Sequence, residues 1–153
     1  MSNDMPVESE GRELVPLGRA AARLAKHAEL ALGNVDLSLP QYRVLIMLGR
    51  GSAAASVLAS RLSVSAPSVT AIVDGLVARG MVNRRSDGGD RRRVTHELTD
   101  KGRRMLSEAD AEVGARLEEV VGHLAPRDRQ RAAAGLRLWI DAMDDYVSTS
   151  LDS

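Results

Sequence analysis

Two short helical segments that run directly into a strand-like hairpin constrain the fold of this chain more than any other feature. Residues 57–62 and 66–79 carry apolar side chains at helical spacing, and about three residues join them. This pair matches the helix-turn-helix pattern. Gly80 then ends the second segment. Residues 81–85 and 94–98 have strand character on either side of a turn cluster, so they predict a hairpin whose tip is charged rather than apolar.

Longer helical segments flank this unit on both sides. The range 14–31 carries an apolar residue at every third or fourth position, which is typical of a helix. Ser38 and Gln41 fit a capping box at the start of a second helix. Thr99 is a suitable cap for a long helix, and Pro126 separates that helix from a last one. The predicted order is four helices, two strands and two helices, with no internal repeat.

These elements predict a mainly α fold with a small β-hairpin wing, in which a winged helix-turn-helix is flanked by long helices. We place the winged helix-turn-helix at about residues 38–99 and the long dimerisation helices at about 11–33 and 100–148. Residues 11–148 therefore form a single unit. Residues 1–10 are polar and acidic, so we expect a disordered tail.

The charges of the chain are balanced in total but unevenly distributed. Lys and Arg number 21, and so do Asp and Glu. Between Arg84 and Arg104, eight basic residues accompany four acidic ones, whereas both ends of the chain are acidic. Such a local basic patch suits contact with nucleic acid. Arg outnumbers Lys by 19 to 2, a bias that favours phosphate and groove contacts but that a GC-rich bacterial genome also produces.

Several kinds of chemistry are excluded by the composition. The chain has no cysteine, so it forms no disulfide, thiolate metal site or cysteine nucleophile. It has no nucleophile elbow and no phosphate-binding glycine loop, and its three histidines lie on different elements. We therefore predict that it is not an enzyme and uses no cofactor or metal. There is no apolar run of about eighteen residues and no apolar leader, so a cytoplasmic protein without membrane contact is expected.

The same stretch resembles one known family. Asp90-Arg91-Arg92-Arg93, followed by Leu98-Thr99 and Gly102, is similar to the wing motif of MarR-type transcriptional regulators, and Ser38-Leu39-Pro40-Gln41-Tyr42 also matches. The resemblance covers roughly residues 12–147. The matching positions of the helix-turn-helix and first strand are Leu58, Ala59, Leu62, Val64, Ser65, Pro67, Ser68, Val69, Thr70, Val73, Leu76, Gly80, Met81, Val82 and Arg84.

The second short helix is the predicted recognition helix. Its N-terminal turn would enter the major groove of DNA with short polar side chains, and a helix N-terminus attracts phosphate. The alternative for Ser65 and Ser68 is that they are helix caps alone. Ala66 and Ala71 stand where members of the family often carry larger polar residues, so we expect DNA shape to contribute to specificity. The DNA-binding residues predicted here are Ser65, Ala66, Pro67, Ser68 and Thr70.

The hairpin tip is the second predicted DNA contact. The resemblance implies that Arg92 enters the minor groove, where a narrow groove attracts a guanidinium. Asp90 would hold this guanidinium or a neighbouring one by charge-assisted hydrogen bonds. Arg91 and Arg93 would contact backbone phosphates. The alternative is a solvated run of charges at a turn.

Apolar residues near both ends of the chain predict contact between two copies. The long terminal helices carry apolar stripes that one copy has little core left to cover, although an intrachain packing of three helices is the alternative. The resemblance implies an intertwined homodimer, whose two-fold symmetry calls for a pseudo-palindromic operator with half-sites roughly 34 Å apart. The predicted interface residues are Leu14, Leu17, Leu136, Trp139, Ile140, Met143, Tyr146 and Val147.

A ligand crevice is expected where the long helices join the winged helix. The resemblance implies a small aromatic or phenolic effector. The residues predicted to hold it are Arg23, His27, Tyr42 and Arg43, each of which is alternatively an ordinary core or surface residue. The predicted function is a sequence-specific regulator of transcription that binds double-stranded DNA, a repressor released by a small ligand. The alternative is an architectural or protein-interaction module without an effector.

Overall fold

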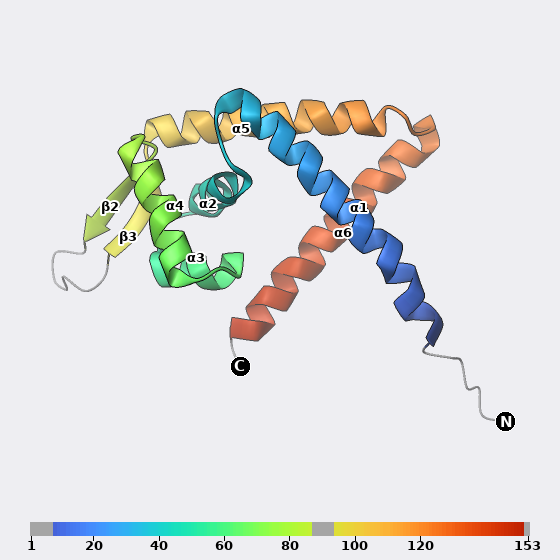
Figure 1. Ribbon diagram of the computed structural model, residues 1–153, viewed down its shortest axis with the longest axis horizontal. Coiled ribbons are helices and arrows are strands. Elements are labelled where there is room, and N and C mark those ends of the chain that lie inside the picture. The colour runs from blue at the N-terminus through green and yellow to red at the C-terminus, as the bar shows by residue number, and fades with distance from the viewer. Residues whose placement is uncertain (1–7, 87–93, 152–153) are drawn as a thin grey trace.

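The computed structural model describes residues 8–86 and 94–151 (Figure 1). The chain is mainly α with a small antiparallel sheet, as predicted. In chain order the elements are α1 (Glu8–Leu32), the 3-10 helix η1 (Gly33–Val35), α2 (Leu39–Gly49), β1 (Ala53–Ala54), α3 (Ala55–Leu62), α4 (Ala66–Ala78), β2 (Val82–Ser86), β3 (Val94–Leu98), α5 (Asp100–Val121) and α6 (Pro126–Leu151).

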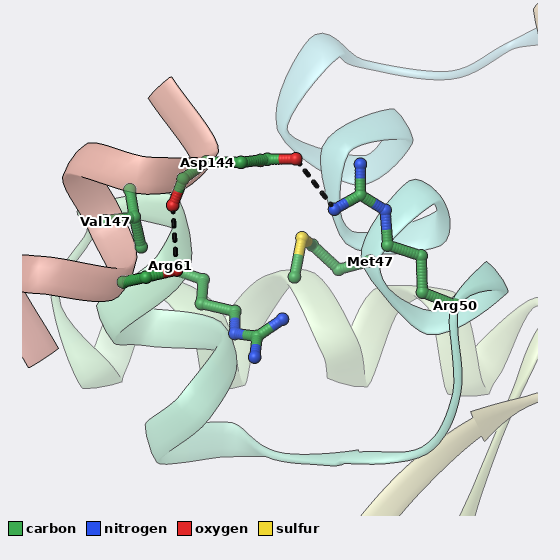
Figure 2. A pocket seen from close by; sticks show the side chains of 6 residues that line it. Met47, Arg50, Arg61, Asp144 and Val147 are labelled. Atoms are coloured by element: carbon green, nitrogen blue, oxygen red, sulfur yellow. Dashed lines mark hydrogen bonds and ion pairs between the residues drawn. The ribbon is translucent and has the colours of Figure 1, made fainter. Parts of the chain in front are cut away.

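A long helix, α5, joins the two parts of the molecule. In Figure 1 its first end leads out of the sheet beside α2 and α4, and its far end turns into α6. Helix α1 packs along α5. Helix α1 extends away from the winged helix, whereas α6 runs back toward it, and the two helices cross in this view. Asp144 of α6 lies 3.5 Å from Arg50, which follows α2 (Figure 2). Both α1 and α6 line one groove. The winged helix-turn-helix is therefore flanked by long helices at both ends of the chain.

Three predicted helix starts are capped as expected. The Ser38 hydroxyl accepts the amide hydrogen of Gln41 at 3.3 Å, and the Gln41 side chain accepts the amide hydrogen of Ser38 at 3.0 Å. This completes the capping box of α2. The Ser65 hydroxyl caps α4 by accepting the Ser68 amide hydrogen at 3.3 Å. Thr99 caps α5 in the same way, so side-chain oxygens satisfy orphan amides at each of these starts.

The hydrophobic core lies between α2, α3, α4, the strands and the first turns of α5. Its fully buried side chains include Leu45, Leu58, Leu76 and Met81. Leu32, at the end of α1, joins the same cluster. Removal of these apolar side chains from water is the main stabilising term, and it fixes the short helices against the strands.

The sheet has three antiparallel strands in the order β1-β3-β2, one more strand than the predicted hairpin. Ala53 of β1 and Arg84 of β2 both pair with His96 at the centre of β3. His96 is buried, and its Nδ1 lies 3.3 Å from the carbonyl oxygen of Ala53, which provides the hydrogen bond that a buried polar ring needs. Two alanines are too few to show a period of two, so β1 left no signal in the sequence.

Two element boundaries differ from the prediction. Helix α1 begins at Glu8, so residues 8–10 of the predicted tail are helical. Polar composition, from which the tail was predicted, does not by itself exclude a helix. Helix α3 begins at Ala55 rather than at 57 because it follows β1 without a loop.

Candidate nucleic-acid interface

The N-terminal turn of helix α4 is polar and exposed. It lies on the opposite side of the helix from the side chains that are buried in the core. Its inward face is apolar, with Val69 and Val73 buried in the core. The structure brings the predicted recognition residues together on the outside of the first turns. The exposed residues are Ser65, Ala66, Pro67, Ser68 and Thr70. A helix N-terminus with short hydroxyl side chains and no bulk fits closely against a phosphate or a base edge.

The hydroxyl groups of this turn are ordered by local hydrogen bonds. The Ser65 and Ser68 hydroxyl oxygens lie 2.7 Å apart. The Thr70 hydroxyl donates to the carbonyl oxygen of Ala66 at 3.0 Å. Ser65 is therefore a helix cap, as the alternative interpretation held, and its exposure leaves a DNA contact open as well. A hydroxyl has one donor and two acceptor positions, so capping does not exhaust it.

Ion pairs tie α4 and the wing strands together. The Arg84 guanidinium of β2 bonds to the Asp74 carboxylate of α4. The Arg85 Nε lies 2.6 Å from Oε1 of Glu97 on β3. The first pair joins the recognition helix to the wing, and the second joins the two strands of the wing to each other. The sequence analysis missed Asp74 and Glu97, because a pairing across ten or more residues leaves no periodic signal.

The wing tip itself is outside the described residues. Strands β2 and β3 end at the pair Ser86 and Val94, so they bring both sides of the tip together. The predicted contact residues Asp90, Arg91, Arg92 and Arg93 lie outside the described ranges and stay a prediction.

The Leu98-Thr99…Gly102 motif has a structural reason. The Thr99 hydroxyl donates to the carbonyl oxygen of Gly80 at 2.7 Å and accepts the amide hydrogen of Gly102 at 3.0 Å. The Thr99 amide donates to the carbonyl oxygen of Met81, also at 3.0 Å. A Cβ on Gly102 would lie 2.0 Å from that same Met81 oxygen. The motif therefore joins the end of α4 to the start of α5. At Gly102 the two backbone segments lie so close together that only glycine fits.

The predicted interface residues form an exposed apolar face on α1 and α6. Side chains that are about half exposed or more in the single chain are Leu17, Leu136, Trp139, Ile140, Met143 and Tyr146. A groove of about 430 Å³ runs between the two helices. Its lining residues are Leu17, Gly18, Ala20, Ala21, Leu24, Leu136, Trp139 and Met143. Val147 is partly buried, and the Leu14 side chain is outside the described part.

Three of the four predicted effector residues, Tyr42, Arg43 and His27, bond to different partners. The Tyr42 hydroxyl donates to Oδ1 of Asp110 on α5 at 2.6 Å, and burial together with this hydrogen bond raises the pKa of Tyr42 above its ordinary value. Arg43 donates to the Leu62 carbonyl oxygen of α3 at 3.0 Å. The structure does not gather these two polar groups toward one point.

The other two predicted effector residues lie on α1. Arg116 Nε of α5 donates to Nδ1 of His27 at 3.2 Å, and Arg23 is exposed. Within one chain, His27 and Tyr42 therefore face α5, Arg43 faces α3 and Arg23 faces solvent. Long-range partners on α5 could not be read from sequence spacing.

The described residues offer no cluster of metal ligands and no single membrane-spanning helix. Over residues 8–86 and 94–151, no group of three His, Cys, Asp or Glu side chains could hold a metal ion. In the same ranges no single helix is long and apolar enough to cross a membrane, while α3 and α4 together, bent by 114°, have the length and composition to do so.

The fold and the exposed turn of α4 define a winged helix-turn-helix protein of the nucleic-acid-binding kind. The transcriptional regulator BldR from Sulfolobus solfataricus is similar in structure, with a TM-score of 0.72 and 27% identity over 90% of this chain and 99% of that one. Mycobacterium tuberculosis Rv2887, a MarR family protein, is similar in fold. Its complex with DNA has a TM-score of 0.69 and 23% identity over 89% of this chain and 98% of that one. Its complex with salicylic acid has a TM-score of 0.69 and 24% identity over 91% of this chain and 99% of that one.

Sequence comparison finds similarity to one family. The sequence profile of the MarR family matches residues 35–93. The transcriptional regulator AdcR of Streptococcus pneumoniae is 30% identical over 106 residues, which are 69% of this chain and 65% of AdcR. Together these matches support a MarR-type transcriptional regulator that binds DNA. These relatives are regulators and not enzymes, as the sequence analysis predicted.

Proposed function

We propose that this chain is a homodimeric repressor that binds pseudo-palindromic double-stranded DNA and is released by a small ligand. The observation that carries the DNA-binding proposal is the first turn of α4. Its five predicted contact residues are all exposed, while Val69 and Val73 fix the opposite face in the core. The complex of the similar protein Rv2887 with DNA supports this use of the fold.

The helix and the wing would read DNA in different ways. Ser68 and Thr70 of α4 would meet base edges or phosphates in the major groove. Arg92 would enter the minor groove, with Asp90, Arg91 and Arg93 orienting it or meeting phosphates. The Arg84–Asp74 pair supports a joint contact, because it joins α4 to strand β2 of the wing.

A mobility-shift titration against the promoter region beside the chain's own gene tests the proposal. We expect a discrete site containing an inverted repeat. The double substitution Ser68→Ala with Thr70→Ala should weaken binding roughly tenfold or more, since each lost contact is worth about 1 kcal/mol or more. Ser107→Ala, on the exposed side of α5, is the control and should leave affinity unchanged. Equal affinity of the double variant would rule out α4 as the recognition helix.

The same titration distinguishes a sequence-specific regulator from an architectural module. An architectural winged-helix module would bind many genomic fragments with similar affinity and strong dependence on salt. A sequence-specific regulator would keep its preference for one site as salt rises. Broad binding without a preferred fragment would favour the architectural function.

The homodimer is proposed from the exposed apolar face of α1 and α6. Trp139 and Met143 line a groove of about 430 Å³ together with small residues of α1. A contiguous apolar surface of this kind marks an association site. The sequence pattern of both terminal helices and the similarity to the MarR family favour a second copy of the chain as the occupant, since closed two-fold dimers bury the same surface on both partners.

The ligand-release proposal rests on the junction between the long helices and the winged helix. Arg23, His27, Tyr42 and Arg43 are the proposed effector residues, and a carboxylate or phenol is the proposed chemistry. The complex of Rv2887 with salicylic acid supports a small aromatic acid. An effector that binds only one arrangement of the two recognition helices would shift the population away from the DNA-bound form.

A further inference from the structure

The C-terminal end of α6 approaches the winged helix of the same chain. Between Pro126 and Thr149 no side chain is buried in the single chain, and from Leu136 to Thr149 only Val147 is partly covered. Val147 lines one cavity together with Met47 of α2. The partial burial of this side chain therefore marks the place where α6 meets the winged helix.

Charges of opposite sign face each other at this place. Figure 2 shows Asp144 reaching from α6 toward Arg50, which follows α2, while Arg61 of α3 extends into the same cavity. Arg50 Nη1 lies 3.5 Å from Oδ2 of Asp144. Two guanidinium groups of the winged helix thus share a cavity with one carboxylate of α6, so electrostatic attraction favours this position of α6.

The ion pair contributes little to folding stability. The Arg50 and Asp144 side chains are 55% and 60% exposed, and water weakens an ion pair of this exposure. The backbone of Arg50 is held at the end of α2, where its amide donates to the carbonyl oxygen of Met47 at 3.2 Å. What the pair affects is therefore the position of α6 relative to the winged helix rather than the folding of either part.

The long helix α5 turns a small change of angle into a large displacement. Along the chain the winged helix and α6 are connected through α5 and the turn after it, and Arg50 and Asp144 are 94 positions apart. Helix α5 has 22 residues, so it is about 33 Å long. A tilt of about 10° at one end of such a rod moves its other end by about 6 Å. This is close to two steps of a DNA helix, which rises about 3.4 Å per base pair.

We propose that Asp144 is a positioning residue for DNA binding. By pairing with Arg50 it fixes the winged helix relative to the long helices, and so it sets the separation of the two recognition helices in the dimer. The inference rests on the homodimer of the proposed function and names the contact that orients its two DNA-binding units. Loss of the pair leaves the surface of α4 unchanged but makes the distance between the two copies of α4 variable.

Double electron–electron resonance on the DNA-free dimer measures this distance directly. The chain has no cysteine, so Ala71→Cys, exposed on α4, gives one spin label per copy. We expect a narrow distribution of label distances in this parent protein. Asp144→Asn removes the charge and keeps the shape, and it should widen the distribution by up to about 6 Å, the displacement that the length of α5 allows. Asp141→Asn, on the same helix but outside the cavity lining, is the matched control and should keep the distribution narrow.

Two further measurements distinguish positioning from a general loss of structure. Arg50→Gln should widen the distribution as Asp144→Asn does, and the double variant should widen it no further, because both substitutions remove the same interaction. High salt should widen the distribution of the parent, since it screens exposed charges, and should leave that of Asp144→Asn unchanged. The melting temperatures of all variants should stay close to that of the parent.

Each result decides the role of Asp144. Equal widths in the parent and in Asp144→Asn would overturn the positioning role, and so would equal widening by Asp141→Asn and Asp144→Asn. A parent that gives no dipolar signal would contradict the homodimer, and the positioning role would fall with it. A search that finds no operator would contradict the proposed function and leave the distances unaffected, since they are measured without DNA.

Discussion

Thr99 shows at the scale of a single residue how the chain holds its DNA-binding surface in place. Its hydroxyl is 2.7 Å from the Gly80 carbonyl oxygen and 3.0 Å from the Gly102 amide nitrogen, so one side chain spans the end of α4 and the start of α5. The sequence predicted the cap. It could not predict the bond to Gly80, because a contact across nineteen residues depends on tertiary packing.

Replacing Thr99 with valine tests this link. The substitution keeps the side-chain shape but leaves the Gly102 amide and the Gly80 carbonyl without their partner. We expect Thr99→Val to lower the free energy of unfolding by about 1–3 kcal/mol. Urea denaturation measures it. Thr70→Val is the control, because the Thr70 hydroxyl donates only within its own helix, and it should cost clearly less. Equal losses of stability in the Thr99→Val and Thr70→Val proteins would contradict the link between α4 and α5.

Arg92 is the residue on which the wing prediction depends. We expect Arg92→Ala to weaken operator binding at least about tenfold, since a guanidinium in a groove contributes roughly 1–3 kcal/mol. The loss should be largest for AT-rich flanks, where the minor groove is narrow. Titration at fixed salt measures it, with Arg131→Ala on α6 as a control of equal charge change. Unchanged affinity together with an unchanged melting temperature would remove the wing from the interface.

At the scale of elements, local signals predicted what local chemistry determines. The caps at Ser38, Ser65 and Thr99 were predicted because a hydroxyl and the amides it satisfies lie within three residues of each other. Strand β1 was not predicted, because its two residues pair with residues of β3 that lie more than forty positions away in the sequence. The start of α1 was placed late because polar composition indicates disorder even where acidic residues favour a helix N-terminus.

The packing of α5 against the end of α4 gives a prediction for Gly102. Alanine is favoured over glycine in a helix by about 1 kcal/mol, but a Cβ at this position would lie 2.0 Å from the Met81 carbonyl oxygen. We therefore expect Gly102→Ala to destabilise the protein by about 1–3 kcal/mol through forced backbone movement.

A second glycine of the same helix is the matched control. A Cβ on Gly114 would meet nothing within 4 Å, so Gly114→Ala should be neutral or stabilise by up to about 1 kcal/mol. Thermal unfolding of both variants gives the comparison. A stabilised Gly102→Ala protein would show that α5 does not approach Met81 so closely in solution.

At the scale of the whole molecule, the candidate interface divides into a part that sequence predicts and a part that it does not. The exposed turn of α4 was predicted, because apolar periodicity identifies its buried face and so its outer face. The Arg84–Asp74 ion pair was not predicted, because the charges in the sequence do not show which arginine pairs with which carboxylate. The Arg50–Asp144 pair joins residues 94 positions apart and needed the fold to be seen.

Trp139 tests the assembly of two chains. Its side chain is 49% exposed in the single chain, so its burial requires a partner. We expect Trp139→Ala to cost about 3–5 kcal/mol of dimer stability, seen as dissociation in light scattering. Leu138→Ala is the control, since Leu138 is more exposed, at 69%, and does not line the α1–α6 groove. A stable parent species of 16.4 kDa at micromolar concentration would contradict the dimer.

Ligand release is the last property that belongs to the whole molecule, because it couples two distant sites through the spacing of two recognition helices. If salicylate binds better to the arrangement that does not fit DNA, it must weaken operator binding by its differential affinity. A tenfold loss requires about 1.4 kcal/mol of such difference. Linkage then demands the reverse effect: operator DNA must weaken salicylate binding by the same factor.

Calorimetry of salicylate with and without operator measures both directions. We expect operator DNA and salicylate to weaken each other's binding by the same factor. We also expect Tyr42→Phe to reduce the affinity for salicylate, because in the proposed complex the Tyr42 hydroxyl turns from Asp110 to the ligand. Salicylate that binds without changing operator affinity would mean that this chain represses constitutively, with its own abundance as the controlling variable.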